Sequence, residues 1–252
     1  METGILFFLI WFTGCCLGSF LMVIGLRVPV HQSIIFPRSH CQNCHQTLHF
    51  FELLPILSYA IQKGRCRNCQ QNISILHPLF EALTGFVFLY IFYTYLFFPA
   101  EGVFIIGVVS FSLIFIISDI YYQLLPDSLM ILFFLWVFLG RLAIHPYPFS
   151  FYLLSGIGFF CFLYLFYQFS SASIGGGDVK LLSIIAVLLG FNLTLVAVVI
   201  ACLSALLIHI PLVLSRKLNS KHPIPFAPFI FLGTFSAYFL QDVFIKWFML
   251  GP

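Results

Sequence analysis

Four cysteines form two CxxC pairs, Cys41 with Cys44 and Cys66 with Cys69. Two such pairs can bring four thiolates around one ion at about 2.3 Å, the tetrahedral arrangement that Zn²⁺ takes in structural sites. The arginines on either side of Cys66 would help to keep thiolates deprotonated. A site closed by four sulfurs has no open position for water, so we expect a zinc ion that holds its segment together and does not catalyse.

Two disulfides or four free thiols are the alternatives to a metal site. We expect the segment to be cytosolic, where thiols stay reduced, and this favours the metal. The nearby His40, His45 and His49 could replace a cysteine as ligand. Their more common role in such a segment is that of solvated loop residues.

Asp119 and Asp178 are the acidic residues whose setting indicates catalysis. Asp119 ends an apolar run, and Asp178 follows three consecutive glycines. An ionisable residue at membrane depth is costly, and therefore indicates a function. Two carboxylates in a poorly solvated cleft share one proton, so that one can activate water while the other protonates a carbonyl oxygen. This is the chemistry of aspartic proteases. A helix cap for Asp178 and an ion-paired or lipid-interface position for Asp119 are the structural alternatives.

The neighbours of this pair have expected supporting roles. Gly175 and Gly177 lack a Cβ, so they would let another backbone, such as an extended substrate, approach the carboxylate. Asp127 begins a predicted helix, where Asp serves as N-cap or first-turn residue, and a role in orienting the pair is secondary. Lys180 lies two residues beyond Asp178 and would not share its helix face. We expect Lys180 to anchor the helix at the inner membrane surface.

Lipid must be the solvent for most of this chain. Of its 252 residues 62% are hydrophobic and 8% are charged, whereas a soluble domain carries about a quarter charged residues. No basic cluster is large enough to indicate binding to nucleic acid. We therefore expect an all-α polytopic membrane protein with about eight transmembrane helices and a cytoplasmic four-cysteine zinc loop domain.

Apolar runs separated by polar segments predict the organisation of the chain. A helix needs about 20 apolar residues to cross the hydrocarbon core. The first transmembrane helix is expected in 1–26, the zinc-binding loop domain in 27–77 and a transmembrane peptidase domain in 78–252. The predicted helical segments are 4–26, 78–98, 102–120, 128–143, 149–169, 179–189, 193–214 and 226–248. The sixth is too short to cross the core by itself.

The distribution of Lys and Arg predicts the orientation, because these residues accumulate on the cytoplasmic side. With segment 27–77 inside, Arg141 and Lys246 alone fall outside, of eleven Lys and Arg. Asp119, Asp127 and Asp178 then all lie at cytoplasmic helix ends. Any chemistry that they perform is therefore expected on the inner side of the plasma membrane.

These residues resemble the motifs of type IV prepilin peptidases, especially the late-competence processing enzymes of Gram-positive bacteria. The resemblance covers about residues 14–185. The matching motifs occur in order: Gly18-Ser19-Phe20-Leu21 with Arg27 and Pro29, the CxxC pairs with 52–59 and 64–67, then 77–84, Asp119 with Leu125-Pro126-Asp127, and Gly175-Gly176-Gly177-Asp178-Val179-Lys180. Met22 departs from the family, which usually has Asn at that position.

The resemblance implies a GxGD aspartyl protease with Asp119 and Asp178 as its catalytic pair. Family substrates are prepilins or pseudopilins, which carry a short basic leader ending in Gly and then a hydrophobic helix. Cleavage follows that Gly at the cytoplasmic membrane face. Many members also methylate the new N-terminus with S-adenosylmethionine. The departure at Met22 concerns this methylation activity and not the peptidase pair. An ion-coupled transporter and a zinc-containing scaffold for pilus or secretion assembly are the competing interpretations.

Overall fold

The computed structural model describes the chain apart from residues 1, 42, 145–146, 170–174, 215–223 and 242–252. Within the described residues it is all-helical, with nine α-helices, two 3₁₀ helices and two isolated β-bridges. It divides into two compact units, Met1–Ile117 and Ser118–Pro252. The three-part division expected above remains a prediction.

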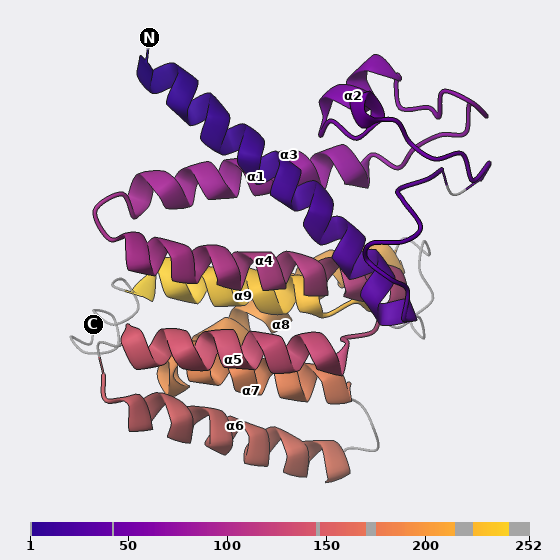
Figure 1. The fold of residues 1–252 in the computed structure, drawn as a ribbon. Helices are drawn as coiled ribbons and strands as arrows, with labels where there is room; N and C mark the ends of the chain where they lie inside the picture. The colour runs from indigo at the N-terminus through magenta and orange to yellow at the C-terminus, as the bar shows by residue number, and fades with distance from the viewer. Residues whose placement is uncertain (1, 42, 145–146, 170–174, 215–223, 242–252) are drawn as a thin grey trace. The chain divides into compact units, whose positions relative to one another are not determined.

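The first unit consists of long apolar helices and a polar loop region (Figure 1). Its helices are α1 (Glu2–Arg27), η1 (Val28–Val30), η2 (Phe50–Glu52), α2 (Leu57–Ile61), α3 (Leu76–Thr94) and α4 (Pro99–Tyr122), whose last residues belong to the second unit. The short helix α2 lies inside the loop region and was not among the predicted segments. The loop region connects α1 to α3, so both of its ends are held by helices.

Small residues allow α1 and α3 to cross closely. A Cβ on Gly14 would lie 2.9 Å from the Cα of Gly85, and a Cβ on Gly18 would lie 2.8 Å from the Cβ of Thr84. The spacing of Gly14 and Gly18 places both on one face of α1, as in the GxxxG pattern of packed membrane helices. This crossing therefore depends on Gly14 and on Gly18, the residue that begins the first motif of the sequence.

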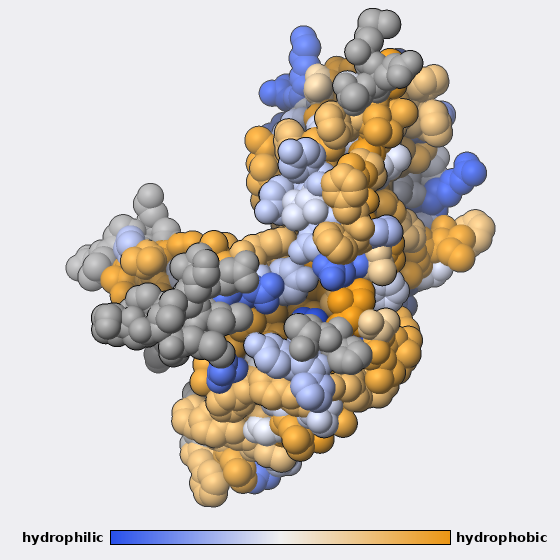
Figure 2. Space-filling model, turned by 90° about the vertical axis from the view of Figure 1, so that its left-hand side faces the viewer, coloured by the Kyte–Doolittle hydropathy of each residue, from blue (hydrophilic) through white to orange (hydrophobic). Residues whose placement is uncertain are grey.

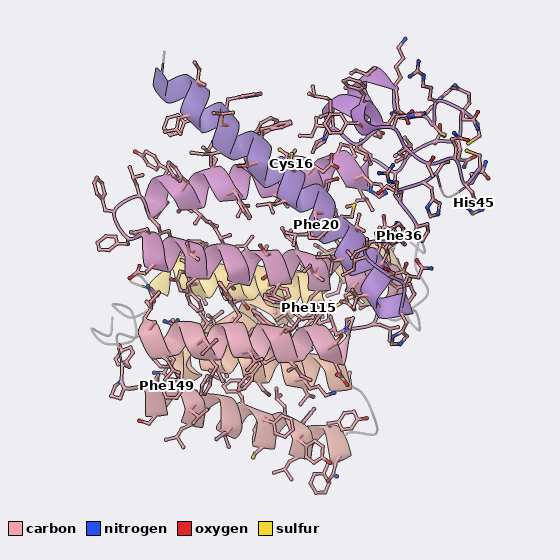
Figure 3. The ribbon with its side chains drawn as sticks, in the orientation of Figure 1. Cys16, Phe20, Phe36, His45, Phe115 and Phe149 are labelled. Atoms are coloured by element: carbon pink, nitrogen blue, oxygen red, sulfur yellow. The ribbon has the colours of Figure 1, made fainter. Side chains whose placement is uncertain are left out.

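The second unit is a bundle built around α7. Its helices are α5 (Asp127–Ala143), α6 (Phe149–Phe169), α7 (Gly176–Leu189), α8 (Phe191–Leu214) and α9 (Ala227–Phe239). Each residue of α7 from Leu181 to Leu189 is buried, and α5, α6, α8 and α9 all pack against this helix. A helix that is apolar on every side belongs in a core. In Figure 3, Phe149 marks the start of α6, where its ring meets Phe138 of α5 edge to face, with 5.1 Å between centroids.

The helices define a multi-pass membrane protein. Five helices of the described residues are long and apolar enough to cross a bilayer, namely α1, α3, α4, α6 and α8. Hydrophobic side chains cover much of the visible surface in Figure 2, as expected for contact with lipid.

All eight predicted segments overlap an observed helix, but the number of crossings remains a prediction. Helix α7 has 14 residues and is about 21 Å long, against a core of about 30 Å. It begins three residues before the predicted start, at Gly176. Of the last predicted segment, α9 covers residues 227–239, and the part beyond residue 241 lies outside the described residues.

Candidate active site and metal centre

The two CxxC pairs form two turns of the same geometry. In the first, the His45 N–H donates to the Cys41 carbonyl at 2.9 Å; in the second, the Gln70 N–H donates to the Cys66 carbonyl at 2.9 Å. His45 and Gln70 both have left-handed backbones, with φ of 56° and 58°. Local hydrogen bonds therefore form each turn, and each turn presents two sulfurs on the same side.

The four sulfurs converge into one cluster in the loop region. The Sγ atoms of Cys41 and Cys69 are 3.7 Å apart, and those of Cys44 and Cys66 are 4.0 Å apart. All four lie within 4.8 Å of one another. Four sulfurs placed tetrahedrally at 2.3 Å from an ion would be about 3.8 Å apart. The cluster therefore fits a metal ion, and its distances are too long for disulfides.

Histidines do not complete this cluster. Among the described residues, its ligand atoms come from the cysteines alone. The ring of His40 instead contacts the carbonyl of Arg38 at 2.9 Å, and His45 projects from the loop region in Figure 3. The two observations agree with the expected role of these histidines as solvated loop residues.

Each CxxC pair contains an asparagine whose side chain contacts a cysteine sulfur of the other pair. The amide of Asn68, in the second pair, donates to the sulfur of Cys44 at 3.7 Å, and the side chain of Asn43, in the first pair, bonds to Cys69. A hydrogen bond from the Gln71 N–H and, to a smaller extent, one from the Asn43 side chain lower the pKa of the Cys69 thiol to about 6. The thiolate is the form that binds metals. We had not predicted these donors, although Asn precedes the second cysteine in both pairs.

Asp119 lies near the end of α4 with its carboxylate buried, at 6% exposure. Its Oδ2 accepts a hydrogen bond from the Ala227 N–H at 2.7 Å, and the Phe226 N–H also bonds to it. Ala227 is the first residue of α9, where backbone N–H groups have no partner within their own helix. The start of α9 is therefore the neighbour that fixes Asp119, and the sequence contained no signal for this contact.

The turn after Asp119 is held by its own hydrogen bonds. The Ser118 hydroxyl donates to the carbonyl of Leu124, and the Gln123 N–H donates to the carbonyl of Asp119 at 2.9 Å. Gln123 has a positive φ of 53°, which reverses the chain at this point. The turn directs the chain from the end of α4 to the start of α5.

Asp178 is half-buried in the first turn of α7, which Gly175 precedes as N-cap. The charges of Asp178 and Asp119 are close enough to interact. Within the described residues, no hydrogen-bond donor contacts the Asp178 carboxylate. The structure thus brings the two predicted carboxylates to the same end of the second unit, in different surroundings.

The glycines before Asp178 differ in what they allow. A Cβ on Gly177 would lie 3.2 Å from two side-chain atoms of Leu125, whereas a Cβ on Gly176 would meet nothing within 4 Å. A Cβ on Gly175 would lie 3.0 Å from Oδ2 of Asp178. Gly177 therefore provides space for Leu125, a use that differs from the expected approach of a substrate backbone.

Asp127 and Lys180 form an ion pair between the starts of α5 and α7. Lys180 Nζ lies 2.6 Å from Asp127 Oδ1, and both side chains are exposed. Asp127 is the first residue of α5, while Pro126 occupies the N-cap position and no side chain caps this helix. Of the two structural roles expected for Asp127, the first-turn position is therefore the one observed.

Glu81 shows a role that the sequence did not indicate. Helix α3 begins at Leu76 and its first turn has no acidic residue, so Glu81 does not stabilise the N-terminus of its helix. Glu81 is buried instead, and its Oε2 accepts the Ile56 N–H at 2.8 Å. Ser19 of α1 also bonds to this carboxylate. Glu81 therefore ties the loop region and α1 to α3.

Helices that cross a membrane, a four-cysteine cluster and a pair of interacting carboxylates define the class of this protein. Residues 12–95 match the family described as bacterial peptidase A24 N-terminal domain, and residues 105–210 match the type IV leader peptidase family. The chain belongs to the type IV leader peptidase family. No solved structure matches it significantly.

The relatives share most of their length with this chain. The prepilin leader peptidase/N-methyltransferase of Bacillus subtilis is 35% identical over 242 residues, covering 94% of this chain and 95% of the relative. The protein of the same name in Legionella pneumophila is 30% identical and covers 86% and 77%. That of Aeromonas salmonicida is 25% identical and covers 96% and 94%.

Proposed function

We propose that this protein is a membrane aspartyl endopeptidase that removes the basic leader from prepilin or pseudopilin precursors. Cleavage follows the Gly that ends the leader, at the cytoplasmic face of the plasma membrane. Asp119 and Asp178 are the catalytic pair. The observation that carries this proposal is that two carboxylates nearly sixty positions apart interact at one end of the second unit.

The surroundings of the pair suit peptide hydrolysis. Asp119 is buried and Asp178 half-buried, so water solvates neither fully and the pair holds one shared proton. The ionised carboxylate takes a proton from water, and the protonated one donates to the scissile carbonyl oxygen. Asp127, Lys180, Gly175 and Gly177 support the site by holding the starts of α5 and α7.

The orientation in the membrane rests on charge. Lys180 lies at the end of the second unit that carries both carboxylates, and the Lys and Arg residues of the loop region belong to the same predicted face. That face is the cytoplasmic one by the distribution of Lys and Arg. The basic leader of a precursor, which stays in the cytoplasm, would meet the site there.

Cys41, Cys44, Cys66 and Cys69 would hold a zinc ion, whose role would be structural. The sulfur separations match tetrahedral coordination at the Zn–S length, and four thiolates leave no position for a reacting water. Zinc would hold the two turns of the loop region together. It would take no part in hydrolysis.

A second activity, N-methylation of the new N-terminus with S-adenosylmethionine, is favoured by the names of the relatives. Met22, where the family usually has Asn, is buried in α1 with 3% of its surface exposed. An apolar residue here removes a polar side chain from this position. Methylation is therefore measured separately from cleavage, by the mass of the processed N-terminus.

Cleavage of a pseudopilin precursor by membranes that contain Asp119→Asn or Asp178→Asn tests the peptidase proposal. Asn keeps the size of the side chain but cannot exchange the proton. We expect either change to reduce cleavage by about 10²–10⁴-fold at equal protein level, which is the contribution of general acid–base groups. The matched control is Glu101→Gln, a carboxylate in the first turn of α4, at the opposite end of that helix.

The outcomes separate the competing functions. Loss of cleavage in both Asp variants and normal cleavage in Glu101→Gln would support the catalytic pair. Normal cleavage in either Asp variant would show that the assignment of the pair is wrong. A wild-type protein that cleaves no precursor would favour the transporter or the scaffold.

A further inference from the structure

The two carboxylates of the proposed pair have unequal surroundings. Asp119 accepts a hydrogen bond from the Ala227 N–H at 2.7 Å and another from the Phe226 N–H. The described residues provide no such donor for Asp178. Donors to a carboxylate stabilise its charged form, and a helix N-terminus adds favourable potential for a negative charge.

Packing keeps the start of α9 in place. Ala227 is fully buried, and so are Ile230 and Phe231 one turn further along α9. The ring of Phe231 meets that of Phe133 on α5, with 6.5 Å between centroids. A donor held by buried side chains needs no reorganisation when charge develops on its acceptor.

We propose that the start of α9 is a positioning element of the active site that assigns the shared proton. It holds Asp119 as the ionised member, which acts as general base, and leaves the proton on Asp178, which acts as general acid. This inference rests on the proposed peptidase function. It extends the site beyond the two matched aspartate motifs to Ala227, which lies outside the family-matched residues 105–210.

The division of roles balances the reaction. Asp119 takes a proton from water as the water oxygen forms a bond to the scissile carbonyl carbon, and Asp178 gives its proton to the carbonyl oxygen. The tetrahedral diol then loses the proton of one hydroxyl to Asp178. Asp119 returns its proton to the leaving nitrogen as the C–N bond breaks. The products are a carboxylic acid and an amine, and both aspartates regain their starting states.

Among the residues that the structure describes, few other charges face this end of the second unit. Helix α7 contributes Asp178 and Lys180, and α5 contributes Asp127, which pairs with Lys180 at 2.6 Å. Helix α8, which packs against α9, carries His209 near its C-terminal end. None of these groups donates to Asp119 in the described residues, so the N–H groups of α9 are its identified donors.

Replacing a single N–H by oxygen tests the inference. Cell-free synthesis into liposomes, with L-lactic acid in place of Ala227, changes that amide to an ester. The change removes the Ala227 N–H donor to Asp119 and makes the Phe226 carbonyl a weaker acceptor for the N–H groups of Phe229 and Ile230. The matched control is phenyllactic acid in place of Phe229, whose N–H bonds to the Phe226 carbonyl within the helix at 3.1 Å. Single-turnover cleavage of a pseudopilin precursor is measured across pH for both esters and for wild type.

We expect the ester at 227 to reduce the cleavage rate about tenfold and to move the acid limb of its pH profile upward by about one unit. The sign follows because, without the donor, Asp119 ionises only at higher pH. The control ester should leave the limb in place, since it weakens the helix and not the carboxylate contact. An ester at 227 whose acid limb coincides with that of wild type, or shifts no more than the control, overturns the inference.

Failure of the proposed function would look different. In that case Asp119→Asn would cleave normally, and the acid limb of the pH profile could not be assigned to Asp119. Failure of the inference alone leaves Asp119 essential and the acid limb unmoved by the ester at 227.

Discussion

The thiol cluster and the carboxylate pair are both sets of ionisable residues in a chain with few charges, but they are built in opposite ways. The four cysteines come from two turns formed by local hydrogen bonds. The asparagine side chain of each turn contacts a cysteine sulfur of the other turn. The carboxylates come from α4 and α7, and their supports come from α5 and α9. The cluster is local and symmetric, whereas the pair is long-range and asymmetric.

This difference follows from what each site must do. A structural metal site needs every coordination position to be filled by a protein ligand, so that no position remains open. A catalytic pair works only when its two members differ, because one must take a proton while the other gives one. Equal turns suit the first requirement, and the one-sided contact of α9 with Asp119 suits the second.

The largest effect should come from removing a sulfur. Cys66→Ser should reduce the bound metal from about one ion per chain to nearly none, since structural zinc sites with four ligands contribute on the order of 10 kcal/mol to folding. Metal content by mass spectrometry and protease sensitivity of the loop region measure this change. Cys161→Ser, which alters an exposed cysteine on α6, is the control. Retention of a full equivalent of metal by Cys66→Ser would contradict a four-sulfur site.

An intermediate effect should come from the contact between Gly177 and Leu125. Gly177→Ala would place a Cβ 3.2 Å from Leu125, and overpacking of roughly 1 kcal/mol would reduce cleavage about fivefold. Gly176→Ala adds the same methyl group to the same turn in open space and should cleave normally. The double variant Gly177→Ala with Leu125→Ala should recover most of the loss. If Gly177→Ala stays impaired without the Leu125 side chain, the glycine has another use, such as access for the substrate.

The smallest effect should come from the ion pair of Asp127 with Lys180. Both groups are exposed, and pairs of this kind contribute about 0.5 kcal/mol, so Asp127→Asn should reduce cleavage less than about threefold. A double-mutant cycle with Lys180→Gln, at low and high salt, isolates the pair. The coupling should decrease with salt. A loss with Asp127→Asn as large as that with Asp119→Asn would instead make Asp127 a third reacting carboxylate.

Local patterns predicted most of the helices and the whole thiol cluster. Each long apolar run overlaps an observed helix, and the two CxxC pairs meet as expected. Residues close in sequence form these features, so spacing alone carries the information. Glu81 shows where this reasoning ends, because its partner is the backbone of Ile56, a loop residue 25 positions away, and no local pattern indicated that contact.

The sequence by itself therefore determined that this chain is a helical membrane protein, which four cysteines form its thiol cluster, and which two aspartates form the candidate pair. Only the tertiary structure decided that the start of α9 contacts Asp119, 108 residues away, that Leu125 fills the space beside Gly177, and that Lys180 pairs with Asp127. The physical reason is that helix packing sets these contacts. The hydrophobic pattern of a helix shows that it packs but not which neighbour it meets, so the asymmetry of the carboxylates is a property of the fold.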